Sequence, residues 1–268
     1  MRKSVLFLST LCIVTAAALA ASSRDAEVLL QAQRLQLEYR QGNLAAAKPL
    51  VKALEAAVAD SGDNADLWEA MGHAYMSLQG SLLAAQSDMP SMIATAERAR
   101  DAYARSLALD GNNHLVRASH GMSQMVSSLL KGDGPGILTG VEEMNAAVRQ
   151  APRSVGVRLT RGFTIIHLPP AMRDTKAVIE DLEFIMNTAP GGRPEDVLHL
   201  LLGDVYAEVG NLETARLEYG QVTGASAFAA EQVKQRMGQD AVPAAAIALV
   251  RAGTGTGCVM CHAPGTDN

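Results

Sequence analysis

The sequence predicts an all-α protein built from repeated helical hairpins. Aromatic residues make up only 4% of the 268-residue chain, while alanine is abundant. This composition favours closely packed helices, because alanine is the best helix former and a poor strand former. A spaced set of residues also recurs along the chain, first as Trp68, Met71, Gly72 and Tyr75 and later as Leu202, Gly203 and Tyr206. Recurrence of such a set indicates a repeat architecture.

Five hairpins are expected between about residues 25 and 223. The first pairs residues 28–39 with residues 44–59, and the second opens near Ala65 and closes at about Asn113. The third and fourth close before Pro152 and Pro190, since proline cannot continue a helix. The fifth covers residues 196–222. A closing helix over about 227–237 is expected to cap the last hairpin with Phe228, Val233 and Met237.

Small residues within this pattern allow two helices to approach closely. Gly72, Gly203 and Ala215 supply the small positions, and large aromatic side chains fill the space around them: Trp68, Tyr75, Tyr206 and Tyr219. The set resembles the tetratricopeptide repeat (TPR), a helix–turn–helix unit of ~34 residues. The resemblance covers residues 25–237. It implies a TPR-like α-solenoid whose groove binds protein partners.

In the earlier hairpins, the spacing between the repeat residues differs from the TPR pattern. Nine positions separate Tyr206 from Ala215, whereas twenty-four separate Tyr75 from the equivalent Ala99. Similar insertions are expected around residues 132–136 and 167–170. Because insertions in repeats map to loops on one face, the sequence predicts long loops along one edge of the array.

The N-terminus has the features of an export signal. Met1-Arg2-Lys3 is positively charged, residues 5–17 are almost entirely apolar or small, and Ala18-Leu19-Ala20 forms a cleavage site. Residues 1–20 therefore read as a cleaved signal peptide, the alternative being an uncleaved anchor. No later stretch is long and apolar enough to span a bilayer. This places the mature protein in a bacterial periplasm.

Residues 238–268 form a separate, flexible tail in this interpretation, because they include the Gly/Thr stretch 253–257. The tail carries Cys258-Val259-Met260-Cys261-His262, the C-x-x-C-H motif of c-type haem attachment. Cys258 and Cys261 would form the thioethers of one covalent haem c, and His262 would be the proximal iron ligand. The remaining cysteine, Cys12, lies in the segment expected to be removed. A zinc knuckle and a redox-active C-x-x-C are the alternatives.

A sixth iron ligand has to come from the repeats or from a partner, or be absent. In TPR proteins the first helix of each pair lines the groove, and mapping that rule onto this sequence gives an apolar groove lined by His73, Met76, Met122, Met125, Phe163 and Ile166. Of these, His73, Met122 and Met125 are the candidate sixth ligands. His199 occupies the position that Trp68 fills in its own repeat, and it is expected to pack between helices.

The net charge of −5 argues against a nucleic-acid partner, and no hydrolase or transferase motif is present. The acidic pairs Glu142-Glu143 and Glu180-Asp181 are expected to lie on solvated helix faces. The sequence thus predicts a non-enzymatic periplasmic TPR scaffold that carries one haem. It would serve electron transfer or haem-dependent docking, with redox or assembly proteins as partners. The alternative is a periplasmic TPR adaptor without a redox role.

Overall fold

The computed structural model describes residues 44–84, 87–188 and 195–237, and no strand occurs in these ranges. The elements are α2 (Leu44–Asp60), α3 (Ala65–Ala84), α4 (Met89–Leu109), α5 (His114–Lys131), α6 (Gly134–Gln150), α7 (Val155–Ile165), the 3-10 helix η1 (Pro170–Met172), α8 (Thr175–Thr188), α9 (Glu195–Glu208), α10 (Leu212–Gly220) and α11 (Ala227–Met237). The all-α prediction is therefore confirmed for the described chain.

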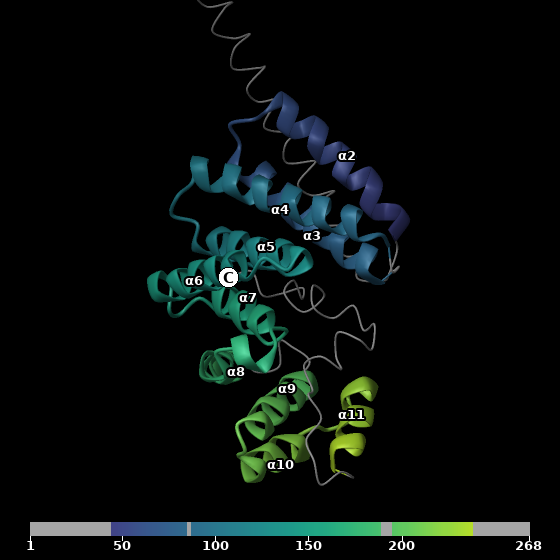
Figure 1. Cartoon of the computed structure of the whole chain (residues 1–268), viewed down its shortest axis with the longest axis vertical. Coiled ribbons are helices and arrows are strands. Elements are labelled where there is room, and N and C mark those ends of the chain that lie inside the picture. Colours follow the sequence, from purple (N-terminus) through teal and green to yellow (C-terminus); the bar gives the residue numbers. More distant parts are fainter. Residues whose placement is uncertain (1–43, 85–86, 189–194, 238–268) are drawn as a thin grey trace, which may run out of the picture.

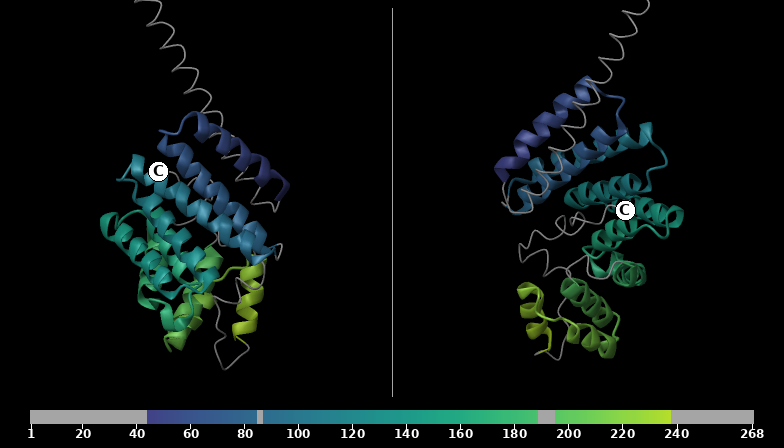
Figure 2. Two further views of the ribbon diagram at one scale, coloured as in Figure 1. Left: turned by 45° about the horizontal axis from the view of Figure 1, so that its top comes forward. Right: turned by 180° about the vertical axis from the view of Figure 1, so that it is seen from behind.

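The helices stack in chain order along the longest axis of the molecule (Figure 1). Four antiparallel hairpins, α3/α4, α5/α6, α7/α8 and α9/α10, follow one another, with α2 packed on α3 and α11 packed on α9. Figure 2 shows the same succession from two further directions. This is the TPR-like α-solenoid that the sequence predicted. The predicted first helix of the first hairpin (28–39) and the tail (238–268) lie outside the described residues.

Polar caps fix where the helices begin. Just before α5, α6, α7 and α10, a side-chain oxygen accepts a hydrogen bond from the backbone N–H three residues on, at 3.0–3.3 Å; these caps are Asn113, Asp133, Ser154 and Asn211. Each cap satisfies a backbone donor that the first helical turn leaves unpaired. Gly132 and Gly210 follow α5 and α9 with φ of 71° and 81°, a conformation that L side chains disfavour. The hairpin turns are thus encoded locally.

Glycines set the distance between paired helices. A Cβ on Gly72 would lie 2.5 Å from the Tyr103 ring, and one on Gly203 would meet the equivalent Tyr219 ring. These contacts confirm the predicted close approach in the second and fifth hairpins. In the α5/α6 hairpin two glycines face each other, and a Cβ on Gly121 would lie 2.7 Å from the carbonyl oxygen of Gly140. Backbone contacts backbone at this crossing.

The predicted long loops are mostly wrong, because the inserted residues lengthen helices instead. α3 and α4 have 20 and 21 residues, whereas α9 and α10 have 14 and 9. The α5–α6 connection is only Gly132-Asp133. The stretch between Tyr75 and Ala99 is rich in the helix formers Ala, Leu, Met and Gln, so the helices on either side extend through it at little cost. Only the insertion at 167–170 lies in a longer connection, which includes η1.

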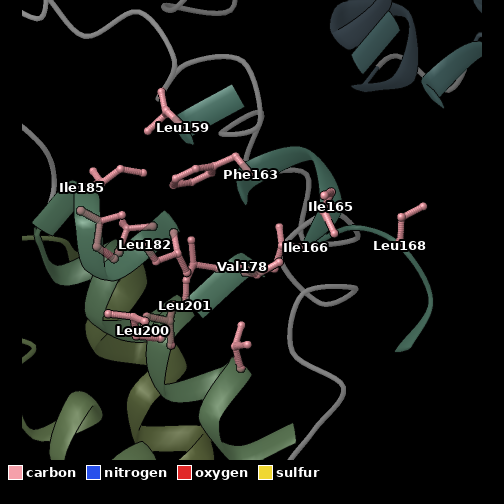
Figure 3. Close-up of a cluster of buried hydrophobic side chains, with 14 of the residues drawn as sticks. Leu159, Phe163, Ile165, Ile166, Leu168, Val178, Leu182, Ile185, Leu200 and Leu201 are labelled. Atoms are coloured by element: carbon pink, nitrogen blue, oxygen red, sulfur yellow. The ribbon is translucent and has the colours of Figure 1, made fainter. Parts of the chain in front are cut away.

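The predicted open apolar groove is also wrong at most of its positions. Met76, Met125, Phe163 and Ile166 are 5%, 2%, 6% and 1% exposed. Figure 3 shows the Phe163 ring within the main apolar cluster, with Leu182 and Val178 below it in the view. Helices α8 and α9 help to bury Phe163 and Ile166, since Val178, Leu182, Leu200 and Leu201 belong to the same buried cluster. Met76 is buried in the separate cluster of α2, α3 and α4. These positions build the core.

The terminal helix caps the array differently from the prediction. Its bounds, Ala227–Met237, agree with the sequence, but Met237 is 56% exposed. Ala229 is fully buried, Val233 is partly buried against the main cluster, and Arg236 is 6% exposed. An arginine thus occupies the buried stripe where an apolar residue was expected.

Candidate functional site

The predicted haem-attachment residues Cys258, Cys261 and His262 lie outside the described residues, as does the predicted signal peptide 1–20. The described part of the candidate site consists of side chains that lie between the packed helices. These side chains include the three predicted sixth ligands and several residues that the sequence did not point to. Within this part of the chain, no helix has the length and apolar character needed to cross a membrane.

The three predicted sixth ligands do not form one site. His73 Nδ1 lies 2.8 Å from the Tyr103 hydroxyl, and its Nε2 lies 3.5 Å from a carboxylate oxygen of Glu69. Both ring nitrogens are therefore engaged. Met125 is 2% exposed within the main apolar cluster, and Met122 is partly buried between that cluster and the one around α3 and α4. His73 and Met125 therefore present no available donor atom at an open surface.

Two other histidines bridge the helices of their hairpins. His120 of α5 places Nδ1 2.7 Å from Glu143 of α6, and His199 of α9 places Nδ1 2.8 Å from Glu218 of α10. The imidazole side chains are 22% and 17% exposed. The interhelical position of His199 agrees with the sequence prediction. In both pairs a carboxylate fixes the ring orientation, which is how proteins orient imidazoles that bind metals.

Asp181 contradicts the expectation of a solvated acidic face. It is fully buried in α8, and both of its oxygens accept hydrogen bonds from Arg161 of α7, at 2.7 and 2.8 Å. Arg158 donates a third bond at 2.8 Å, and its guanidinium also lies 4.5 Å from the centre of the Phe184 ring. The adjacent Glu180 is exposed, as expected. Asp181 therefore locks α7 to α8.

Burial raises the pKa of Asp181, while the neighbouring Arg161 and Arg158 guanidinium groups act in the opposite direction. A buried carboxylate with bidentate and further charge-assisted bonds is strongly oriented. Its removal would leave two arginines without their partner. The local sequence held a signal for this network: two arginines, at 158 and 161, share one face of an otherwise apolar helix.

A second buried carboxylate, Asp204 of α9, joins three helices. It accepts hydrogen bonds from the Tyr219 hydroxyl of α10 at 2.7 Å and from Arg236 of α11, one of them at 2.9 Å. Burial raises the pKa of Asp204, and Arg236 and Tyr219 oppose that shift. The sequence signal was the spacing of Ala229, Val233 and Arg236 at i, i+4 and i+7, which places the arginine on the buried face of α11.

Asp196, at the start of α9, holds the turn that leads into α11. Its carboxylate accepts hydrogen bonds from the backbone N–H groups of Thr223, Gly224 and Ser226 at 2.8, 3.0 and 2.8 Å. The Thr223 hydroxyl donates a fourth bond at 2.9 Å. Burial acts to raise the pKa of Asp196, but the bonds from Ser226, Thr223 and Gly224 outweigh it and lower the pKa. Asp196 and Asp204 together fasten α11 to α9.

Asp196→Asn is expected to lose stability in a pH-dependent way. The pKa of this carboxyl is lower in the folded state than in the unfolded state. Its contribution to the free energy of unfolding is therefore complete above about pH 5 and decreases as the pH falls below about 4. Urea unfolding of the full exported chain should therefore separate wild type from the variant by about 1–3 kcal/mol at pH 7. The gap should narrow at pH 3. A gap that is constant or widens on acidification would contradict the assignment.

The described residues contain no group of three or more His, Cys, Asp or Glu side chains placed to hold a metal ion. They do provide single, carboxylate-oriented imidazoles, which suit an axial position on a metal that is held elsewhere.

Comparisons with known proteins assign no family to the chain. No family model matches it, and no curated protein matches it either. The crystal structure of MamA protein aligns with 80% of this chain and 97% of its own, with 12% sequence identity and a TM-score of 0.44. A likeness at this level supports no conclusion about function.

Proposed function

We propose that this chain is a bacterial periplasmic scaffold that carries one covalent c-type haem on its C-terminal segment. The haem would serve electron transfer or haem-dependent docking within a multiprotein redox assembly. In this proposal Cys258 and Cys261 bind the porphyrin, and His262 ligates the iron. The TPR-like solenoid positions the haem against protein partners and is not itself a catalyst.

One observation carries the proposal: the sequence contains C-x-x-C-H together with a predicted N-terminal export signal. Attachment of c-type haem needs two reduced thiols and an adjacent histidine, and the motif supplies all three within five residues. The chain has three cysteines, and the third, Cys12, falls in the predicted signal peptide. Both cysteines of the exported protein would then belong to the motif.

The solenoid supports the scaffold half of the proposal. Stacked helical hairpins present an elongated surface, and repeat proteins of this architecture use such surfaces to bind other proteins. The net charge of −5 disfavours nucleic acid as the partner. A protein partner in a redox assembly agrees with both features.

The experiment that tests this proposal measures whether haem is covalently attached to the chain. The full chain would be exported from a bacterial host with and without a cytochrome c maturation system, and its intact mass would be measured after denaturation. The proposal predicts a gain of one haem only in the host with the maturation system, and loss of that gain in Cys258→Ala/Cys261→Ala. An unmodified mass in both hosts would contradict it and would leave a non-redox periplasmic adaptor.

A further inference from the structure

The described solenoid ends on a helix whose outer face is apolar and exposed. Figure 1 shows α10 at the end of the array farthest from α2, with no described helix beyond it. Ala215 and Tyr219 are buried on the inner face of α10, and the Tyr219 ring packs on Gly203 of α9. Leu217 lies on the opposite face and is 63% exposed. Terminal repeats normally present a polar outer face, which keeps the protein soluble.

Two further apolar side chains are exposed close to Leu217 in the chain. Leu212 lies in the first turn of α10, and Val209 lies in the turn before it. Three of the eight large apolar side chains that are exposed in the described residues therefore fall within positions 209–217. The capping helix α11 leaves them exposed, because it is held to α9 by Asp204 and Arg236. Apolar side chains that gather in this way indicate an interaction surface.

Two opposite charges lie between the leucines of this face. Glu213 and Arg216 are both exposed and are three positions apart on α10. Exposed charges at the same spacing on α11, Glu231 and Lys234, pair with each other at 3.8 Å. By contrast, the structure gives neither Glu213 nor Arg216 a side-chain hydrogen bond or ion pair within the described chain. Both charges are therefore available to a partner.

The pattern of these four residues is complementary to itself. In an isologous contact, residue i of one copy meets residue j of the second copy, and residue j meets residue i. When two α10 helices pack antiparallel with the two-fold axis between positions 214 and 215, Glu213 of each copy meets Arg216 of the other. Leu212 and Leu217 then flank these two ion pairs. At 100° per residue, all four positions fall within an arc of about 140° on the helix.

We propose that the outer face of α10, which consists of Leu212, Glu213, Arg216 and Leu217, is the interface of a symmetric antiparallel homodimer. The occupant is a second copy of this chain, because one helix supplies both partners of each ion pair and both halves of the apolar contact. The interface is small, since α10 has only nine residues. The dimer therefore forms reversibly and at high protein concentration. This proposal goes beyond the proposed function and stands without it.

Sedimentation equilibrium of the exported full chain would measure the association over a range of concentrations. A thiol reductant excludes dimers linked through Cys258 or Cys261. The wild type should show a reversible monomer–dimer equilibrium. Leu217→Glu should raise the dimer dissociation constant by about tenfold or more, because it places a charge in the apolar contact. The matched control, Leu138→Glu, changes a leucine of α6 that is 58% exposed and should leave the dissociation constant unchanged.

Charge reversal tests the pairing across the two-fold axis. Glu213→Arg and Arg216→Glu each place like charges opposite one another, so each variant alone should dimerise about tenfold more weakly than the wild type at low salt. An equimolar mixture of the two variants should form heterodimers about as tightly as the wild type, because every pair then joins opposite charges. Circular dichroism of each variant would show that the fold is intact.

Three results would overturn the proposal. A wild type that stays monomeric at its highest soluble concentration would show that a second copy does not occupy this face, which would leave it to residues 238–268 or to a different protein. A dimer that persists in Leu217→Glu, or that is lost in Leu138→Glu, would place the contact between copies on another surface. A mixture of the two charge-reversal variants that associates no better than either variant alone would contradict the antiparallel pairing of α10.

Discussion

Asp181→Asn is expected to destabilise the solenoid by about 3–5 kcal/mol, which is the cost of removing one partner from a buried ion pair. The carboxylate is fully buried and accepts bonds from Arg161 and Arg158 at 2.7–2.8 Å. Asparagine keeps the shape of the side chain but not its charge, so the guanidinium groups stay between α7 and α8 without a counter-charge. Urea unfolding followed by far-ultraviolet circular dichroism would measure the change at pH 7.

The neighbouring residue provides the matched control. Glu180 is exposed, and its nearest ionic contact, with Lys176, is 3.8 Å long. Glu180→Gln removes the same charge one position away and should change stability by no more than about 0.5 kcal/mol. If the two variants unfolded at the same urea concentration, the buried network would not hold α7 to α8 as described.

Gly140→Ala is expected to destabilise the α5/α6 hairpin by about 1–3 kcal/mol, despite the higher helix propensity of alanine. The new Cβ would press on the Gly121 carbonyl oxygen and would lie 2.7 Å from the backbone nitrogen of Met125. Both are backbone atoms of α5, so no side chain can rotate away and the helices must separate. Thermal and urea unfolding would measure the loss.

Gly220→Ala is the control for this substitution. Gly220 ends α10, and a Cβ there would meet nothing within 4 Å. The Gly220→Ala variant should therefore have the same unfolding midpoint as the wild type, or a slightly higher one. A Gly140→Ala variant as stable as Gly220→Ala would show that α5 and α6 are not held at backbone contact.

Much of the fold could be predicted because its signals are local. Proline and polar caps delimit the helices, so Ala65 as the start of one helix and Ala227–Met237 as another agree with the structure. Gly72 and Gly203 occupy equivalent positions in the recurring spacing, and Tyr219 is one of the aromatic residues expected beside them. That spacing does not include Tyr103, the aromatic residue that contacts Gly72. Each of these features depends on neighbours within one hairpin.

The remainder depends on side-chain contacts between helices, which the periodicity of each single helix does not encode. From the sequence alone, Asp181 looks like one member of an exposed acidic pair. Only the structure shows that Arg161, on the neighbouring helix, donates a hydrogen bond to it. Phe163 and Ile166 fit an open groove until α8 and α9 close over them. The insertions fit loops because the family pattern places them there, whereas helix propagation makes longer helices. The carboxylate-held imidazoles of His120 and His199 likewise need the partner helix to be recognised.

The most direct test of the central claim is the haem content of the exported chain after extraction with acidified acetone. Extraction removes haem that is bound only by coordination and leaves haem that is bound through thioethers. We expect one haem per chain to remain with the protein, with a pyridine haemochrome spectrum of a two-thioether haem. A colourless protein after extraction, or a full spectrum in Cys258→Ala/Cys261→Ala, would contradict a covalent haem at this motif.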